Sequence, residues 1–161
     1  MVIEPLDFRS PKWLPGGHLQ TIFPAIIGKK FLKNFYNIKY SRETWFTPDE
    51  DFIEIDWIKK NDYRKPLLIL FHGLEGSSES YYSILFANIA LLRDWKFAVV
   101  HFRGCSGKIN IAPRSYHAGD SNEVDWIIKK FNAHCIKYDC ELFSIGVSLG
   151  GNALLKWAGE K

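Results

Sequence analysis

The sequence predicts an α/β fold in which a mostly parallel sheet is covered by helices on both faces. Three short runs, 67–71, 97–102 and 142–147, are apolar without alternation, which is typical of central parallel strands. Between them, 81–94 is broadly apolar and 123–134 has apolar residues at helical spacing. Because strand–helix–strand crossovers are right-handed, this order places helices on both sides of the sheet.

Further elements flank this core. Residues 52–58 alternate apolar and acidic side chains, which favours a strand with one face in water, and 48–51 reads as the turn from a shorter strand at 43–47. A last helix is expected at 149–158, with Gly159 as its stop.

The predicted organisation is one domain over residues 1–161. It has an irregular segment at 1–40, which contains four prolines, followed by a β-hairpin at 41–60 and a βαβαβα core at 66–161.

Composition excludes several classes of protein. Apolar residues make up 47% of the 161 residues, enough to build a core, so disorder is excluded. The formal charge of +3 is too weak to indicate nucleic-acid binding. The sequence contains no run of about 18 apolar residues, so we expect no transmembrane helix. Acidic residues and prolines near the N-terminus do not resemble a signal peptide, so we expect a cytoplasmic protein. The three cysteines lack metal-site spacing and are expected to be free thiols.

The strongest motif is G-x-S-x-G at Gly146–Gly150, between an expected strand and an expected helix. Such a sharp turn forces Ser148 into a strained conformation, and side chains at Gly146 and Gly150 would collide across it. The turn lifts the Ser148 hydroxyl into a cleft at the carboxyl end of the sheet, above a helix N-terminus that favours negative charge. The motif predicts a serine nucleophile.

Two phosphate-binding alternatives fail on the same residues. A P-loop requires G-K-[ST], whereas Gly150-Gly151 is followed by Asn152, and a dinucleotide fingerprint requires G-x-G-x-x-G. A nucleotide-binding module is therefore disfavoured.

A second glycine-containing loop, His72–Gly76, follows the expected strand 67–71. An oxyanion hole needs two backbone N–H donors, one from the residue after the nucleophile and one from such a loop. We expect these donors to be Leu149 and Leu74. For His72 itself we favour a structural role with hydrogen bonds to nearby backbone.

Several segments together resemble the α/β-hydrolases of the YheT family, bacterial relatives of the ABHD-type lipid hydrolases. The matching segments are Trp13–Thr21, His72–Ser78, Arg103–Gly107, Pro113–His117 and Gly146–Lys156. The resemblance implies a serine hydrolase of carboxylic esters, with acyl or lipid-like small-molecule substrates and without a metal or organic cofactor. The segment 13–21 is expected to pack across the sheet or to rim the entrance of the site.

The roles of the other matching segments are less closely defined by their residues. Residues 103–107 follow an expected strand, so they either line the cleft or only turn the chain. Arg114, Tyr116 and His117 are expected to buttress the same edge of the sheet. Cys105 has no evident base beside it and is not expected to act as a nucleophile.

The general base of a triad is missing from the sequence after Ser148. The triad order of this fold is Ser, then Asp or Glu, then His, but residues 149–161 contain only Glu160 and no histidine. We therefore expect a truncated hydrolase, whose strand at 142–147 has an unpaired outer edge. Two interpretations remain open: an enzyme completed by a complementary C-terminal half, or a non-catalytic remnant.

Overall fold

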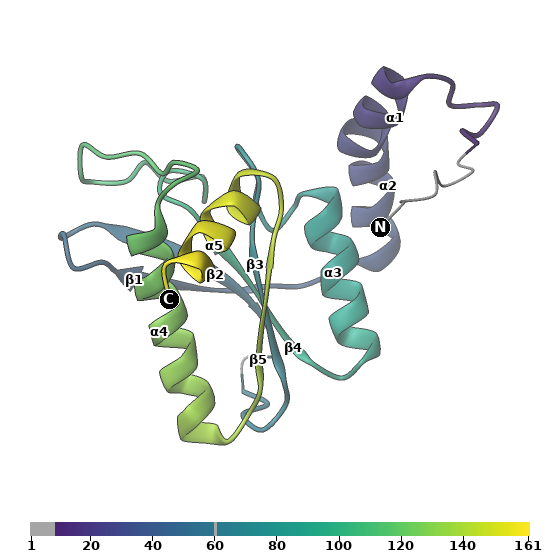
Figure 1. The fold of residues 1–161 in the computed structure, drawn as a ribbon. Helices are drawn as coiled ribbons and strands as arrows, with labels where there is room; N and C mark the ends of the chain where they lie inside the picture. The colour runs from purple at the N-terminus through teal and green to yellow at the C-terminus, as the bar shows by residue number, and fades with distance from the viewer. Residues whose placement is uncertain (1–8, 60) are drawn as a thin grey trace, which may run out of the picture.

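The computed structural model describes residues 9–59 and 61–161, and its centre is one five-stranded sheet in the order β1-β2-β4-β3-β5 (Figure 1). The strands are β1 (Ser41–Phe46), β2 (Phe52–Ile58), β3 (Leu67–Phe71), β4 (Lys96–His101) and β5 (Leu142–Gly146). β3 pairs in parallel with β4 and with β5, whereas β2 is antiparallel to β1 and to β4. The α/β prediction is confirmed, and the parallel part of the mixed sheet is β4-β3-β5.

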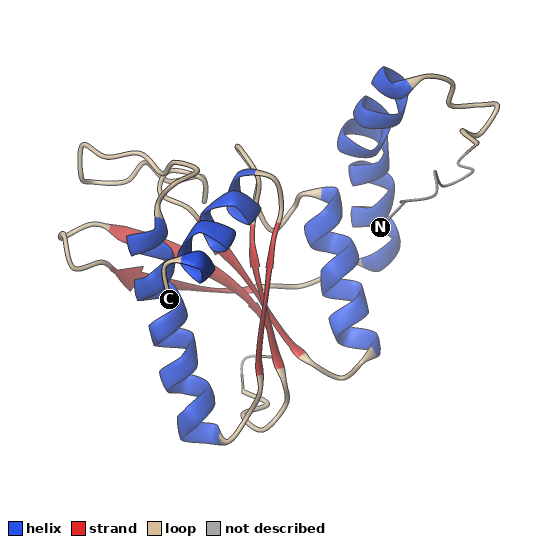
Figure 2. Cartoon of the chain, in the orientation of Figure 1, coloured by secondary structure: helices blue, strands red, loops and turns tan. Residues whose placement is uncertain are grey.

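Helices cover both faces of this sheet, as predicted. They are α3 (Tyr81–Leu92), α4 (Ser121–Tyr138) and α5 (Leu149–Gly159). Figure 2 shows α3 on one side of the strands and α4 and α5 on the other. Alternate side chains of the central strands separate accordingly: Ile69 packs in the cluster with α4 and α5, and Leu70 in the cluster with α3. The apolar runs without alternation are therefore buried on both faces.

The expectation of a wet face on β2 was wrong. This strand lies between β1 and β4, and its acidic side chains Glu54 and Asp56 are only 1% and 3% exposed. Arg42 from β1 binds both carboxylates, and Lys108 from the loop after β4 binds Glu54. The alternation thus reflects a buried ionic layer, because cations from neighbouring segments replace water around the acids.

The expectation of an irregular N-terminus was wrong for residues 17–36. These residues form α1 (Gly17–Phe23), a π-helical turn at Pro24–Gly28 and α2 (Lys29–Tyr36). Pro24 opens the π turn, where its missing N–H is not needed, and the Lys29 N–H donates to its carbonyl. Pro24 therefore marks the start of a helical turn here rather than a break. Residues 1–8 lie outside the described chain.

Residues 9–39 form what we call the N-terminal arm, which stands beside α3 (Figure 1). The arm contacts the body of the molecule mainly through α2 and the π turn on α3. Segment 13–21 does not pack across the sheet, since Trp13 packs edge-on against Phe23 at 5.2 Å within the arm, whereas the alternative that it rims the entrance of the site stays a prediction. No helix in the described parts of the chain has the length and apolar character needed to cross a membrane.

Candidate active site

The turn at Ser148 joins the end of β5 to the start of α5. Ser148 has φ 51° and ψ −115°, a conformation that a residue with a side chain rarely adopts. The turn is closed by hydrogen bonds from the Gly150 N–H to the Val147 carbonyl and from the Asn152 N–H to the Ser148 carbonyl, at 3.0 and 2.9 Å. The strained backbone that the motif predicts at Ser148 is present.

The flanking glycines permit this turn. A Cβ at Gly146 would lie 2.5 Å from the Gly151 Cα, and a Cβ at Gly150 would lie 2.5 Å from the carbonyl oxygens of Phe71 and His72. All of these neighbours are backbone atoms, which cannot rotate away. Glycine is therefore required at both positions for helix α5 to approach the sheet so closely.

The loop at 72–76 lies directly against Ser148. A Cβ at Gly73 would be 3.3 Å from the Ser148 Cβ and from the Val147 carbonyl oxygen, so the loop and the turn approach each other closely. The loop is held by the Tyr82 hydroxyl, which accepts the Gly73 N–H at 3.1 Å, and by the Gly76 N–H, which donates to the Gly73 carbonyl at 2.9 Å. The structure thus brings Leu74, the next residue, to the neighbourhood of Ser148.

His72 is fully buried and has a structural role, as predicted. Its Nε2 accepts the Phe102 N–H at 3.1 Å, which fixes the tautomer in which Nδ1 donates to the Gly73 carbonyl at 2.7 Å. Burial lowers the pKa of His72 to about 4, although the bond to Gly73 opposes the shift. Both ring nitrogens are engaged, so His72 has no nitrogen left to activate Ser148.

Tyr116 supports the loop at 72–76 and so has a structural role, as predicted. Its hydroxyl accepts the Glu75 N–H at 2.9 Å, and its ring stacks on Phe102 at 5.2 Å. His117 instead accepts the N–H of Gly119 in its own segment. Burial raises the pKa of the neighbouring Cys105 thiol, which disfavours the nucleophilic thiolate.

Arg103 is a structural centre that the sequence analysis left undecided. Its buried guanidinium binds Glu123 on α4 at 2.6 Å, Asp51 at 2.7 Å and Asp49 at 2.9 Å. Burial raises the pKa of Asp51, but hydrogen bonds from Ile111, Phe52, Asn110 and Arg103 outweigh it and lower the pKa to about 2. Arg103 therefore joins the β1–β2 turn to α4. No sequence spacing linked these residues, because they are 20 to 54 positions apart.

A polar cluster that the sequence did not predict lies beside a cavity of about 540 Å³. The His101 Nε2 and the Ser78 hydroxyl both bind the same oxygen of Asp56, at 2.9 and 2.5 Å. Burial raises the pKa of Asp56, but hydrogen bonds from Arg42, His101 and Ser78 outweigh it and hold the pKa well below its ordinary range. The only sequence signal for this cluster was the alternation of β2. Cys105 and the two residues after it also line this cavity, whose lining includes neither Ser148 nor the loop at 72–76, so the alternative that 103–107 lines the cleft at Ser148 stays a prediction.

Comparison with known proteins identifies the family. No family model matches the chain. YheT of Escherichia coli (strain K12) is 34% identical over 152 residues, which cover 92% of this chain and 42% of YheT. The chain belongs to the α/β-hydrolase family of the YheT and ABHD type. Phospholipase ABHD3 of Bos taurus is 24% identical over 88% of the chain, and the monoacylglycerol lipase of Saccharomyces cerevisiae is 26% identical over 74%; these matches cover 34% and 25% of the relatives.

Solved structures show the same fold. Esterase Est22 superposes with a TM-score of 0.55 at 19% identity, over 89% of this chain and 47% of that chain. The hyperthermophilic esterase of Pyrobaculum calidifontis gives a TM-score of 0.53 at 16% identity, over 84% and 46%. The chain therefore has the α/β-hydrolase fold and spans less than half the length of these relatives.

Proposed function

We propose that this chain carries the nucleophile of a carboxylic ester hydrolase, with Ser148 as that nucleophile and with acyl or lipid-like esters as substrates. The observation that carries the proposal is the strained Ser148 at the β5–α5 turn, in contact with the glycine loop at 72–76. The printed names of the relatives, a phospholipase and a monoacylglycerol lipase, support the substrate class.

In the proposed reaction the Ser148 Oγ attacks the carbonyl carbon of the ester, and the carbonyl oxygen becomes an oxyanion. The backbone N–H groups of Leu149 and Leu74 donate hydrogen bonds to that oxygen. Leu149 is suited to this role because the first N–H groups of a helix have no acceptor inside the helix. Collapse of the intermediate expels the alcohol, which takes up the proton that the general base removed from the Ser148 hydroxyl. The acyl group left on Ser148 is then removed by water.

The general base of this mechanism is not supplied by the described residues. Within 9–59 and 61–161, no side chain forms a hydrogen bond with the Ser148 hydroxyl, and no histidine follows it in the sequence. A serine without its base loses about 10⁴- to 10⁶-fold in kcat.

Phosphonylation with a fluorophosphonate probe tests the nucleophile without requiring turnover. Because the oxyanion hole leaves part of the rate without the base, we expect slow labelling that peptide mass spectrometry finds on Ser148, and Ser148→Ala should abolish it. Ser78→Ala is the matched control, because Ser78 is a buried serine in another polar cluster. Labelling spread evenly over the serines would refute the assignment.

The second oxyanion donor has a test of its own. Leu74→Pro removes the backbone N–H, and we expect labelling of Ser148 to slow by about 10²- to 10³-fold, the usual cost of one oxyanion donor. Leu74→Ala keeps the N–H and removes only a side chain that is 70% exposed, so it should label at the unchanged rate. Equal rates in both variants would exclude Leu74 as a donor.

A further inference from the structure

The N-terminal arm has a charge opposite to that of the rest of the chain. Residues 9–39 contain six lysines and arginines and neither Asp nor Glu, whereas the remaining residues carry 15 basic and 18 acidic side chains. Lys12, Lys30 and Lys39 are exposed to solvent. A net charge of +6 confined to 31 residues makes the arm a strong attractor of anions.

Large apolar side chains accompany these cations on the surface of the arm. Phe31 and Phe35 of α2 are 66% and 70% exposed, and Trp13 is 67% exposed. The side chains of Leu19, Ile22, Ile26 and Ile27 are also exposed. None of the residues of α1, the π turn or α2 is buried. So much exposed apolar surface on one segment indicates an interaction site.

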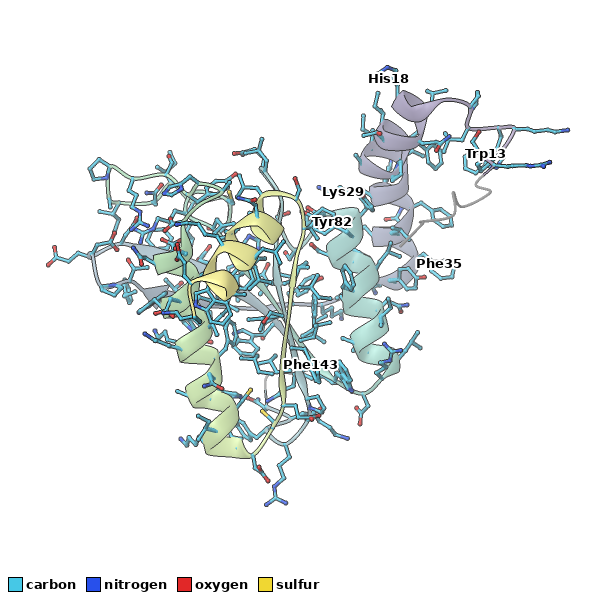
Figure 3. The ribbon with its side chains drawn as sticks, in the orientation of Figure 1. Trp13, His18, Lys29, Phe35, Tyr82 and Phe143 are labelled. Atoms are coloured by element: carbon cyan, nitrogen blue, oxygen red, sulfur yellow. The ribbon has the colours of Figure 1, made fainter. Side chains whose placement is uncertain are left out.

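The contacts of the arm with α3 fix which side of it remains open. Lys29 and Lys33 face Glu79, just before α3, with the Lys33 Nζ 2.6 Å from the carboxylate. On the opposite side of α2, the rings of Phe31 and Phe35, which are one helical turn apart, stack with their centroids 5.9 Å apart. Figure 3 shows Phe35 and Trp13 pointing away from the sheet, with Lys29 and Tyr82 at the junction of the arm and the body.

We propose that the N-terminal arm docks on an anionic lipid surface. Exposed Phe and Trp side chains would enter the boundary between headgroups and acyl chains, while the lysines around them would contact the anionic headgroups. Charge complementarity favours this partner over a second copy of the chain, because two arms of charge +6 repel each other. The inference does not depend on Ser148, so the proposed hydrolase could fail and the docking surface still stand.

Co-sedimentation of the 161-residue chain with vesicles tests the proposal. We expect binding to vesicles of phosphatidylcholine mixed with phosphatidylglycerol, loss of binding as sodium chloride rises, and little binding to phosphatidylcholine alone. Substituting Lys12, Lys30 and Lys39 by Gln should weaken binding about 100-fold, since each lysine near an anionic surface contributes about five-fold. The matched control is the triple substitution of Lys129, Lys137 and Lys161 by Gln, which removes three exposed lysines outside the arm.

The apolar side of the arm has a parallel pair of variants. Phe31→Ser with Phe35→Ser should lower vesicle binding by about ten-fold or more. Ile109→Ser with Ile111→Ser removes equally exposed side chains elsewhere and should leave binding unchanged. Hydrogen exchange of the unaltered chain is a second measurement, in which vesicles should protect peptides from 9–39 and not those from α4.

Three results would overturn the proposal. They are binding that does not require phosphatidylglycerol, binding that survives both arm variants, and a dimer formed through Phe31 and Phe35 in place of vesicle binding. The last result would assign the apolar side of the arm to a second copy of the chain.

Discussion

Gly150 holds the Ser148 turn against β3, with backbone oxygens of Phe71 and His72 2.5 Å from the place a Cβ would take. Gly150→Ala should therefore lower the free energy of unfolding by about 1–3 kcal/mol, the usual cost of overpacking a site that cannot relax. Urea denaturation measures this loss.

Gly159→Ala is the matched control, because a Cβ at the end of the same helix meets nothing within 4 Å. Alanine there should be neutral or slightly stabilising. If both variants unfolded at the same urea concentration, the close approach of α5 to β3 would be disproved.

His72 makes stability depend on pH. Its pKa is about 4 in the folded chain and 6.5 in the unfolded chain, so the unfolded chain binds the proton first as the pH falls. The contribution of His72 to stability is thus complete above pH 6.5 and is lost between pH 6.5 and 4, by roughly 3 kcal/mol in all.

Denaturation curves between pH 5 and 7 isolate this effect, because ordinary carboxylates titrate below that range. His72→Gln, which keeps one donor and one acceptor, should flatten the dependence of unfolding free energy on pH. His18→Gln, at an exposed site on α1, should leave it unchanged. A slope that persists in His72→Gln would show that another group carries it.

At the scale of elements, Arg103 connects the β1–β2 turn, the loop after β4 and helix α4. Asp51 and Glu123 are 0% and 5% exposed. Removing the guanidinium leaves Asp51 without its cation and Glu123 with only the more distant Arg114, at 3.7 Å. Arg103→Met should destabilise the chain by about 3–5 kcal/mol. Arg64→Ala, which removes an exposed arginine, should change stability by less than about 0.5 kcal/mol, and equal effects in thermal unfolding would contradict the network.

The core elements could be predicted from the sequence because local patterns determine them. The run 67–71 and the helix at 121–138 show their burial directly in their apolar spacing. The burial of Glu54 and Asp56 could not be predicted, because it depends on Arg42, Lys108 and His101 from other elements. The helices of the arm were missed because Pro24 reads as a breaker in sequence, although it is compatible with the start of a turn.

The candidate site divides in the same way. The glycines around Ser148 have a local steric cause, so the motif alone predicts the strained turn. The Tyr116 and Tyr82 hydroxyls accept hydrogen bonds from the N–H groups of Glu75 and Gly73. These are tertiary contacts, which no residue spacing in the sequence indicated.

At the scale of the whole molecule, protection from hydrogen exchange should fall from the centre of the sheet to β5. β3 and β4 have partners on both sides, whereas β5 pairs only with β3 within the described chain. We expect amides of β3 and β4 to exchange by global unfolding and the outward amides of β5 to exchange faster. Equal protection of β5 would mean that its outer edge has found a partner, such as a second copy of the chain.

In the proposed hydrolase, Ser148 faces two backbone donors, the N–H groups of Leu149 and Leu74. The most direct measurement is an NMR comparison of ¹⁵N-labelled chain before and after phosphonylation, because the adduct places a phosphoryl oxygen where the oxyanion would form. We expect downfield shifts of the Leu149 and Leu74 amide protons, with no shift at Gly107 in the loop after β4. An adduct on Ser148 that leaves both leucine amides unmoved would contradict it.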